Sequence, residues 1–384
     1  MGNLAEPEIG ELLVTPEILA TARDVCELAA AGERPRALAR AEECLKLLLN
    51  REPTIGRFHV QFLPRQVLGV LDDSQILISI DGEHRHLRIP EEIVRKNFNN
   101  FVLRFETVRK FCVTDPVLSV SRGKAIWDLR DGSRVGNYPR IAFCANSENA
   151  YLIVDPFFVR DEGYKQLRGA IQLHWIPWHE RKQILFWRGS LTGFRQYTPQ
   201  QTKPLQDWRW HQRLHLCDVA SKSRHKEHMD IGVVEAPGGG LAAEEFLAIA
   251  IKEAGFVKQR SKKLDFLNYR YIVDIDGYAN AWDGLFTAML MGATVFKVAS
   301  PYGFRQWYYD KLVPWQNYIP VSADLNDLDD RIDWALSHPD DCADMGHSLA
   351  DLAKQMSYER EFLRSAEVVR QMFANQPSHA FLVG

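Results

Sequence analysis

The feature that most constrains the fold is a strand-helix-strand pattern between residues 270 and 299. Apolar residues recur there at helical spacing and form one stripe, at Trp282, Leu285, Phe286, Met289 and Leu290. Short apolar runs at 272–275 and 295–298 flank this stripe, as in buried parallel strands. Two such strands joined by a helix form a βαβ crossover, so the pattern predicts a parallel sheet covered by helices.

The loop after the first of these strands runs from Asp276 to Gly284 and reads DGYANAWDG. In a βαβ unit this loop lies beside the N-terminus of the helix, where free amides and the helix dipole favour phosphate groups. Asp274 and Asp276 also form an Asp-Ile-Asp run, which suits a divalent metal held under a diphosphate. The residues alone leave both interpretations open, beside a third in which these are ordinary loop carboxylates.

The length of the chain predicts more than one domain, because a single hydrophobic core stops growing at roughly 250–300 residues. The chain has 384 residues. Helical spacing interrupted at AGERP predicts a helical hairpin over 16–50, and alternating residues then predict a small β-rich segment. We therefore expect an N-terminal elaboration over 1–95, an α/β domain over 96–178, and a second α/β domain with C-terminal helices over 179–384.

A second candidate for anion binding is the tripeptide Arg188-Gly189-Ser190, which follows the apolar run QILFW. Arginine offers a planar fork of donors with a fixed charge, and glycine lets a ligand approach the backbone. The same tripeptide also fits a strand-ending turn with a surface arginine, which is the commoner case for an isolated match.

Two histidine pairs have a spacing at which they could bind a metal: His211 with His215, and His225 with His228. Neither pair has the third ligand that a zinc helix requires, so a solvated basic helix face is the favoured interpretation.

Three carboxylates follow apolar segments of the first half of the chain, at Asp128, Asp131 and Asp155. An enzyme that activates a hydroxyl group needs one such carboxylate as a general base. The pattern alone does not choose among the three.

Charge and cysteine content exclude several classes of protein. A net charge of −3 gives no global basic field, which argues against nucleic acid as a partner. No apolar run is long enough to span a membrane, and the six cysteines are scattered without a C-x-x-C pair, as in reduced cytosolic proteins. The N-terminus lacks a basic, apolar leader, so we expect a cytoplasmic protein, with association at the inner face of the cell membrane left open.

Several segments, in order, resemble one known family. They are WDLRDGSRVGNYPRIAFCANSE, PWHERKQILFWRGSLTG, RWHQRLHLCDVASKSRHKEHMDIGVVEA and the long stretch from YRYIVDIDG to NYIPV. The chain is similar in them to glycosyltransferase family 90, which includes the Rumi-like protein O-glucosyltransferases, capsule-associated xylosyltransferases and bacterial lipopolysaccharide-modifying enzymes. The resemblance covers residues 120–375 and leaves the first hundred residues unmatched.

The resemblance implies a GT-B-like α/β fold, with two facing Rossmann-like domains and parallel sheets. It implies an inverting, metal-independent transfer of glucose or xylose from a UDP-sugar to a glycan hydroxyl, as in lipopolysaccharide core or capsule, with no cofactor beyond that co-substrate. Asp131 matches the family's general base. The positions implied for donor binding are Arg188, Gly189, Ser190, Thr192, Arg195, Asp276, Gly277, Tyr278, Ala279, Asn280, Ala281, Trp282, Asp283 and Lys297.

One position departs from the family pattern. Animal members carry an arginine in the loop before the helix, and this chain has Trp282 and Asp283 there. Arg188, Arg195 and Lys297 are the candidates to supply the missing charge, together with the helix N-terminus. The departure keeps two alternatives open: a catalytically weak glycan- or nucleotide-binding protein of the same fold, and a metal-dependent transferase that uses the Asp-Ile-Asp carboxylates.

Overall fold

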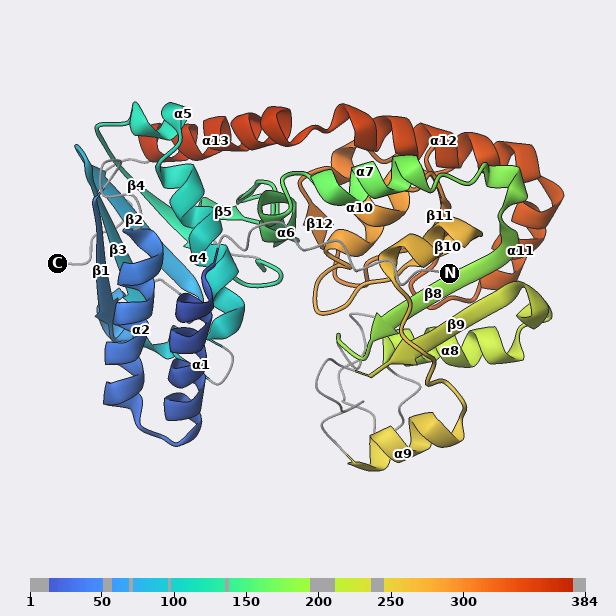
Figure 1. Cartoon of the computed structure of the whole chain (residues 1–384), viewed down its shortest axis with the longest axis horizontal. Helices are drawn as coiled ribbons and strands as arrows, with labels where there is room; N and C mark the ends of the chain where they lie inside the picture. Colours follow the sequence, from blue (N-terminus) through green and yellow to red (C-terminus); the bar gives the residue numbers. More distant parts are fainter. Residues whose placement is uncertain are drawn as a thin grey trace. The chain divides into compact units, whose positions relative to one another are not determined.

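The chain folds into two compact units in the computed structural model (Figure 1). The structure describes residues 14–50, 57–68, 72–95, 98–134, 138–193, 211–235 and 245–375. Unit 1 comprises Met1–Gly163 with Tyr358–Gly384, and unit 2 comprises Tyr164–Ser357. The predicted α/β class is confirmed, whereas the units do not follow the three predicted ranges.

Unit 1 is built on a six-stranded sheet in the order β1-β3-β2-β4-β5-β7. The strands of this sheet are β1 (Arg57–Leu63), β2 (Gln75–Asp81), β3 (His84–Pro90), β4 (Arg122–Asp128), β5 (Arg140–Ala142) and β7 (Ala150–Leu152), and the short strand β6 (Cys144–Ala145) of unit 1 lies outside it. The helices of unit 1 are α1 (Pro16–Ala30), α2 (Arg34–Leu49), α3 (Arg65–Leu68), α4 (Asn99–Cys112), α5 (Asp115–Leu118), α6 (Pro156–Arg160) and α13 (Tyr358–Asn375). The predicted helical hairpin over 16–50 is present as α1 and α2, with Thr15 accepting a hydrogen bond from the amide of Ile18 at 3.3 Å.

Strand pairing explains why the first 95 residues do not form a separate elaboration. β2 runs antiparallel to both β3 and β4, while β1 pairs with β3, and β4 with β5, in parallel. The buried side chains of Ile76 and Ile78 on β2 lie opposite Trp127 and Ala125 on β4, so neither strand can bury its apolar face without the other. The last helix, α13, packs on β4 and therefore belongs to the same unit.

Unit 2 contains a five-stranded sheet in the order β13-β11-β10-β8-β9, in which every pair is parallel. The strands of this sheet are β8 (Lys182–Ser190), β9 (Met229–Val234), β10 (Tyr269–Asp274), β11 (Thr294–Val298) and β13 (Tyr318–Val321), and the short strand β12 (Arg305–Gln306) of unit 2 lies outside it. The helices of unit 2 are α7 (Lys165–Leu173), α8 (Gln212–Lys222), α9 (Glu245–Glu253), α10 (Asp283–Leu290), α11 (Leu328–Ser337) and α12 (Pro339–Gln355). The predicted βαβ crossover is confirmed as β10, α10 and β11.

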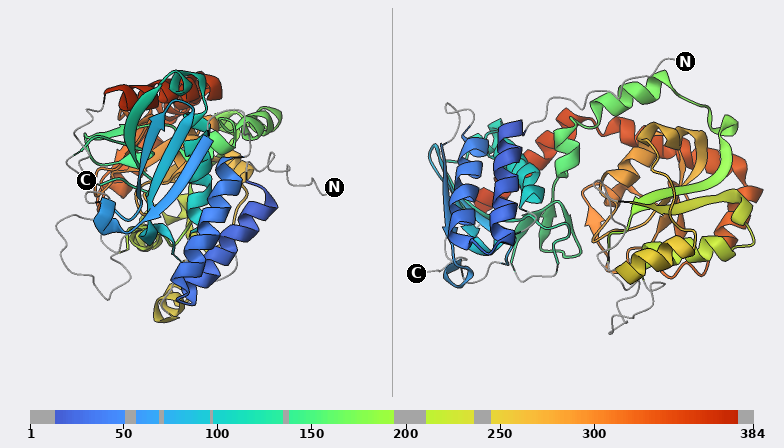
Figure 2. Two further views of the ribbon diagram at one scale, coloured as in Figure 1. Left: turned by 90° about the vertical axis from the view of Figure 1, so that its left-hand side faces the viewer. Right: turned by 60° about the horizontal axis from the view of Figure 1, so that its bottom comes forward.

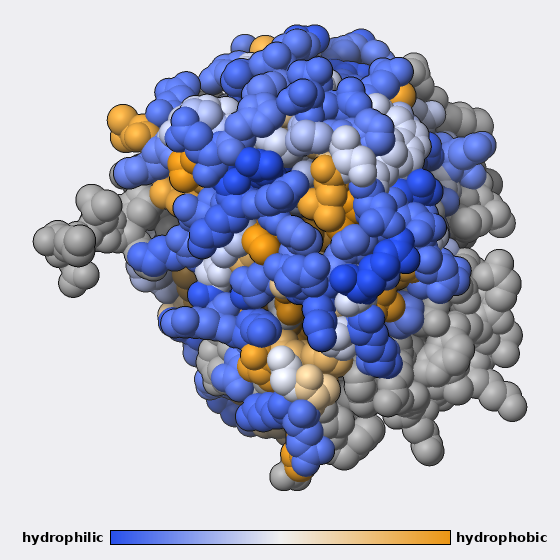
Figure 3. All heavy atoms as spheres, turned by 90° about the vertical axis from the view of Figure 1, so that its right-hand side faces the viewer, coloured by the Kyte–Doolittle hydropathy of each residue, from blue (hydrophilic) through white to orange (hydrophobic). Residues whose placement is uncertain are grey.

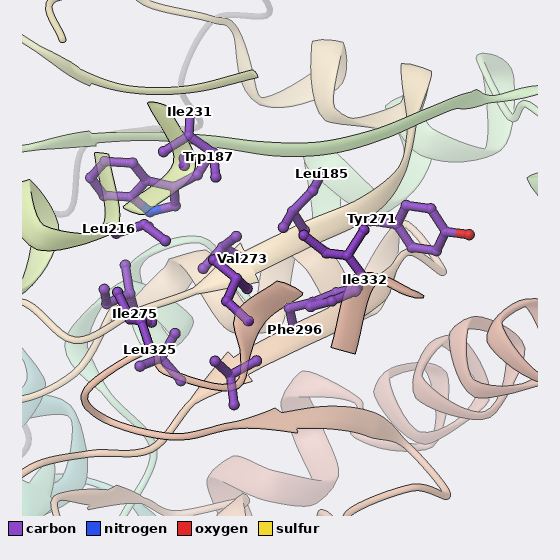
Figure 4. Packing of buried hydrophobic residues seen from close by; sticks show 14 of the residues in the cluster. Leu185, Trp187, Leu216, Ile231, Tyr271, Val273, Ile275, Phe296, Leu325 and Ile332 are labelled. Atoms are coloured by element: carbon purple, nitrogen blue, oxygen red, sulfur yellow. The ribbon is translucent and has the colours of Figure 1, made fainter. Parts of the chain in front are cut away.

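The core of unit 2 forms where side chains of the parallel strands meet the covering helices. Figure 4 shows Leu185 on β8, Val273 on β10 and Phe296 on β11 lying together beneath Leu216 of α8 and Ile332 of α11. Both faces of the sheet are covered, because α10 and α12 also pack on β11. This burial on two sides accounts for the unbroken apolar runs of the strands.

The surface is mainly polar. Figure 3 shows hydrophilic residues over most of one face, with apolar residues scattered among them. Among the described residues, every helix is too short or too polar to cross a lipid bilayer. The six cysteines are free thiols, and five of them are buried.

Candidate functional site

The order of strands in unit 2 creates a point at which the chain reverses its direction of travel across the sheet. From β8 the chain moves to β9 on one side, and it then crosses to β10 on the other side of β8 before continuing to β11 and β13. The loops after β8 and β10 therefore start side by side at the carboxyl edge of the sheet. From there the chain continues in opposite directions, toward β9 and toward β11. Such a switch point is where open α/β sheets form a ligand-binding crevice.

A pocket lies at this switch point, formed by the loops after β8, β10 and β11 and by the start of α8. It is lined by Thr192, Gly193, His211, Gln212, Asp276, Gly277, Tyr278, Ala279, Pro301, Tyr302 and Phe304. The structure thus brings together five of the residues implied for donor binding: Thr192, Asp276, Gly277, Tyr278 and Ala279. Gln212 was not predicted; its side chain is buried and its Nε2 has no hydrogen-bond partner among the described residues.

Arg213 holds the two loops of the switch point together. Its Nε donates to the Asp276 carbonyl at 3.0 Å, and one Nη donates to the Ser190 carbonyl and to Thr192 Oγ1, both at 2.8 Å. Burial lowers the pKa of this guanidinium to about 10. Sequence reasoning missed Arg213, and its signal is a charged residue within the buried run of α8, beside Leu214.

Two glycines allow the loops to come this close. A side chain on Gly193 would place its Cβ 2.9 Å from the Gly277 carbonyl oxygen, and the φ of Gly193 is +129°. A Cβ on Gly277 would lie 3.0 Å from Thr192 Oγ1 and 3.1 Å from an Nη of Arg213. The glycines are therefore needed for the contact between the loops.

Arg188 is directed toward β9, away from the residues that line the pocket. One Nη donates to Asp230 Oδ1 at 2.6 Å, the other donates to the Asp230 carbonyl at 2.8 Å, and the guanidinium lies 4.7 Å from the Phe186 ring centroid. Gly189 and Ser190 also lie outside the lining, although the Ser190 carbonyl accepts from the arginine described above. Arg195 lies outside the described residues.

The Asp-Ile-Asp carboxylates have different surroundings. Lys297 Nζ donates to Asp274 Oδ2 at 2.7 Å and lies 4.4 Å from the Tyr309 ring centroid. Asp276 lines the pocket, and burial raises the pKa of its carboxyl to about 7, although Lys297 acts in the opposite direction. Lys297 is itself outside the pocket lining, so its charge is directed at Asp274.

The two histidines of each predicted pair have different surroundings in the structure. His215 Nε2 lies 3.0 Å from the Asp324 carbonyl, whereas His211 lines the pocket. His225 lies 2.8 Å from Asp333, and His228 Nδ1 lies 3.2 Å from the Gln183 carbonyl. Over the part of the chain that the structure describes, no three His, Cys, Asp or Glu side chains group as a metal site.

The start of α10 is a strained turn. Trp282 has a φ of +51°, and its amide donates to Asn280 Oδ1 at 2.6 Å. A side chain other than glycine in this region costs on the order of 1–3 kcal/mol, which the surrounding structure must offset. Asp283 forms an ion pair with Lys263, which neutralises the carboxylate at the helix N-terminus. Asn280, Ala281, Trp282 and Asp283 lie next to the pocket lining in sequence but are not part of it.

The three candidate carboxylates of unit 1 differ in accessibility. Burial raises the pKa of Asp128, but hydrogen bonds from Arg130, and further ones from Gln75 and Ser133, outweigh it and hold the pKa below its usual value. Asp155 caps α6 by accepting from the amides of Phe157 and Phe158 at 2.9 and 3.0 Å.

Asp131 is the accessible member of the three. Its side chain is 35% exposed and forms an ion pair with Arg104, whose other Nη donates to the Leu129 carbonyl at 2.7 Å. Of the three carboxylates, this one combines exposure with a fixed position.

Comparisons with known proteins match the part of the chain that contains unit 2. A family model described as Glycosyl transferase family 90 matches residues 164–374, just over half of the chain. The matched range begins where unit 2 begins and continues through α13.

Individual relatives match shorter segments. The chain is 37% identical over 78 residues to Protein O-glucosyltransferase 2 of Danio rerio, which is 20% of this chain and 15% of that protein. It is 36% identical over 80 residues to Uncharacterized protein 035R of Invertebrate iridescent virus 3, which is 21% of this chain and 7% of that protein. The chain therefore spans a small part of these relatives.

One solved structure to which the chain is similar is the crystal structure of a glycosyltransferase from Rickettsia africae ESF-5. It is similar with a TM-score of 0.35 and 10% sequence identity, over 62% of this chain and 64% of that chain.

Proposed function

The chain belongs to glycosyl transferase family 90, as its sequence motifs predicted, and from this premise we propose that it transfers glucose or xylose from a UDP-sugar to a hydroxyl group of a glycan. The observation that carries the proposal is the pocket at the switch point of unit 2, where Thr192, Gly193 and Gly277 meet. Small residues at this point let a diphosphate approach the backbone closely.

The donor site depends on fixed polar groups. Arg213 holds the two loops together through hydrogen bonds to their carbonyl groups. Gln212 offers a buried side-chain donor to an oxygen atom of a ligand. The N-terminus of α10 adds a partial positive charge near the leaving diphosphate, and Lys263 offsets the negative charge of Asp283 there. These groups take the role that the family's loop arginine has in animal members.

Asp131 is the general base of the proposed reaction. It takes the proton of the acceptor hydroxyl while that oxygen attacks the anomeric carbon, and the bond from this carbon to the UDP oxygen breaks. UDP leaves with the electron pair, and the configuration at the anomeric carbon inverts. A GT-B arrangement, with the base and the donor residues on different units of the fold, is part of this proposal.

We propose that the transfer requires no metal. The support is the pairing of Lys297 with Asp274, which places an ammonium group where a bound cation would otherwise neutralise that carboxylate. For the acceptor, the family resemblance favours a bacterial-type surface glycan such as lipopolysaccharide core or capsule, modified on the cytoplasmic side of the membrane.

The test is a screen of nucleotide sugars with the full chain. We expect UDP, UDP-glucose or UDP-xylose to raise the melting temperature, since a ligand at 100 times its Kd stabilises the folded state by about 2.7 kcal/mol. UDP release should continue in excess EDTA, and Asp131→Asn should reduce it at least about 100-fold while UDP still binds.

A matched control is Asp161→Asn, which alters another ion-paired carboxylate of unit 1. It should leave UDP release unchanged. If the unaltered chain binds a UDP-sugar but forms no free UDP from it, the result would favour the alternative of a catalytically weak binding protein. Loss of activity in EDTA would favour the alternative of a metal-dependent transferase. Absence of binding by every UDP compound would contradict the proposal.

A further inference from the structure

One face of the unit 1 sheet carries a concentration of basic side chains. The opposite face is covered: Arg85 is buried and donates from its Nε to the Cys112 carbonyl of α4 at 3.2 Å, and Leu87 is fully buried. Because side chains alternate along a strand, the residues between these point to the other face. The strand register groups them as Arg57 and His59 on β1, His84, His86 and Arg88 on β3, and Arg122 and Lys124 on β4. We call these seven residues the basic sheet face.

Ring contacts confirm that side chains from different strands share this face. The His59 and His86 rings stack at 4.8 Å, and the His59 and His84 ring centroids are 5.0 Å apart. Burial, and then the positive charge of His86, His84 and Arg57, lowers the pKa of His59. The histidine rings of β1 and β3 thus lie together on this face, beside Arg57.

The permanent cations of the basic sheet face are not neutralised by neighbours. Among the described residues, Arg57, Arg88, Arg122 and Lys124 form no ion pair. Asp81, opposite Arg122 in the register, and Glu83 in the turn after it are the acids at this end of the sheet.

Basic residues elsewhere in unit 1 behave differently. On α2, Arg36 pairs with Glu33, Arg40 with Asp24, and Lys46 with Glu42. The four unpaired cations of the sheet face thus contrast with the paired cations of α2.

The shape of the face identifies the kind of partner. Figure 2 (left) shows the strands of unit 1 toward the viewer, and at one end of this face Leu68 of α3 packs on Leu77 and Ile126. Neighbouring strands are about 4.8 Å apart and alternate residues about 6.7 Å apart along a strand, so the cations form a two-dimensional array. A nucleic acid strand presents its charges along a line, whereas a lipid surface presents them over an area.

We propose that the basic sheet face docks the protein onto the surface of a membrane that contains anionic phospholipids. The attraction is electrostatic: each Lys or Arg near such a surface contributes favourably, and the contribution falls off within a Debye length. The proposal does not depend on the donor pocket, which lies in the other unit.

The test is flotation of the full chain with vesicles of phosphatidylcholine, with or without phosphatidylglycerol. We expect binding to the anionic vesicles at low salt, little binding to the neutral ones, and release at about 0.5 M salt. The quadruple variant Arg57→Gln, Arg88→Gln, Arg122→Gln, Lys124→Gln should bind at least about tenfold more weakly.

The control variant has the same change of net charge at exposed lysines elsewhere. Its affinity for the anionic vesicles should fall by less than about twofold. Its substitutions are Lys46→Gln, Lys165→Gln, Lys252→Gln and Lys354→Gln. If the quadruple variant fails to fold, the double variant Arg57→Gln, Arg122→Gln alters two exposed side chains, and its affinity for the anionic vesicles should still fall about threefold. Melting curves with UDP establish that the donor site of each variant is intact.

Three results would overturn the proposal. They are equal binding by the quadruple variant and its control, no preference of the unaltered chain for anionic vesicles, and binding of a DNA duplex through the same four residues without binding of vesicles.

Discussion

Asp128 of unit 1 and Asp276 of unit 2 are both nearly inaccessible carboxyl groups at the carboxyl ends of strands, with exposed fractions of 1% and 6%. Their surroundings differ in where the nearest arginine donates. Arg130 donates to the Asp128 carboxylate at 2.5 Å, whereas Arg213 donates to the backbone carbonyl of Asp276 at 3.0 Å.

The consequence of this difference is opposite protonation behaviour. The pKa of Asp128 is held below its usual value, and that of Asp276 is raised to about 7. A buried carboxylate with paired cations stabilises a fold, while a carboxyl group that keeps its proton near neutral pH and lines a pocket is typical of a functional site. The comparison therefore assigns a structural role to Asp128 and supports the proposal that Asp276 belongs to the donor site.

The largest effect is expected for Asp128→Asn. The substitution removes the counter-charge of the fully buried Arg140 and leaves Arg130 paired with Asp72 alone. Removing one partner of a buried ion pair costs about 3–5 kcal/mol. Urea unfolding should show this loss, and the exposed pair of Asp351 with Lys354 provides the control, since Asp351→Asn should change stability by less than about 0.5 kcal/mol. A loss below about 1 kcal/mol for Asp128→Asn would remove the structural role.

The second effect is the contribution of Asp276 to the pH dependence of stability. Because its folded pKa, about 7, lies above the usual value of 3.8, the folded state holds a proton that the unfolded state has released between these values. The free energy of unfolding should therefore fall as pH rises from about 4 to about 7, by up to about 4 kcal/mol, and then level off.

Comparison with Asp276→Asn isolates this contribution. The amide does not titrate, so the difference in unfolding free energy between the two proteins should follow pH over that window, while groups such as Asp128 cancel. Parallel pH profiles of the two proteins would show that the carboxyl of Asp276 is charged throughout.

The third effect concerns the arginine that links the loops. Arg213→Lys keeps a charge but cannot reach the Asp276 and Ser190 carbonyls together with Thr192, so hydrogen bonds to a charged group worth about 1.5–3 kcal/mol are lost. Beyond the loss of stability, the shift in melting temperature caused by UDP should shrink. As a control, Arg270→Lys alters an arginine that donates to the Arg181 carbonyl at the other end of the sheet, and should leave the UDP shift intact. An unchanged UDP shift in Arg213→Lys would separate this residue from the donor site.

The parts of the molecule that sequence predicted best are those set by periodicity. The βαβ crossover and the helical hairpin were visible because buried strands and amphipathic helices impose spacings of their own. The pairing of β2 with β4 was not visible in the sequence, because pairing between strands that are distant in sequence leaves no local pattern.

The same limit applies to the site. Gly277 and Thr192 were predicted from family motifs and lie in the pocket lining, whereas Arg213 and Gln212 were not predicted, because their positions depend on loops that are close only in the folded chain. Arg188 was expected at the diphosphate, but a pattern of residue types does not show that Asp230 on the neighbouring strand takes up its donors.

The smallest effect on stability is expected for Asp131→Asn, although its effect on transfer should be the largest. Its pair with Arg104 is partly exposed, and pairs of this kind contribute about 0–1 kcal/mol. Arg104 also keeps its hydrogen bond to the Leu129 carbonyl in the variant, so no buried charge is left without a partner. Urea unfolding should thus show a change below about 1 kcal/mol in a protein that no longer releases UDP. A loss of more than about 2 kcal/mol would place Asp131 with Asp128 as a structural carboxylate, and the loss of transfer would then follow from the damaged fold.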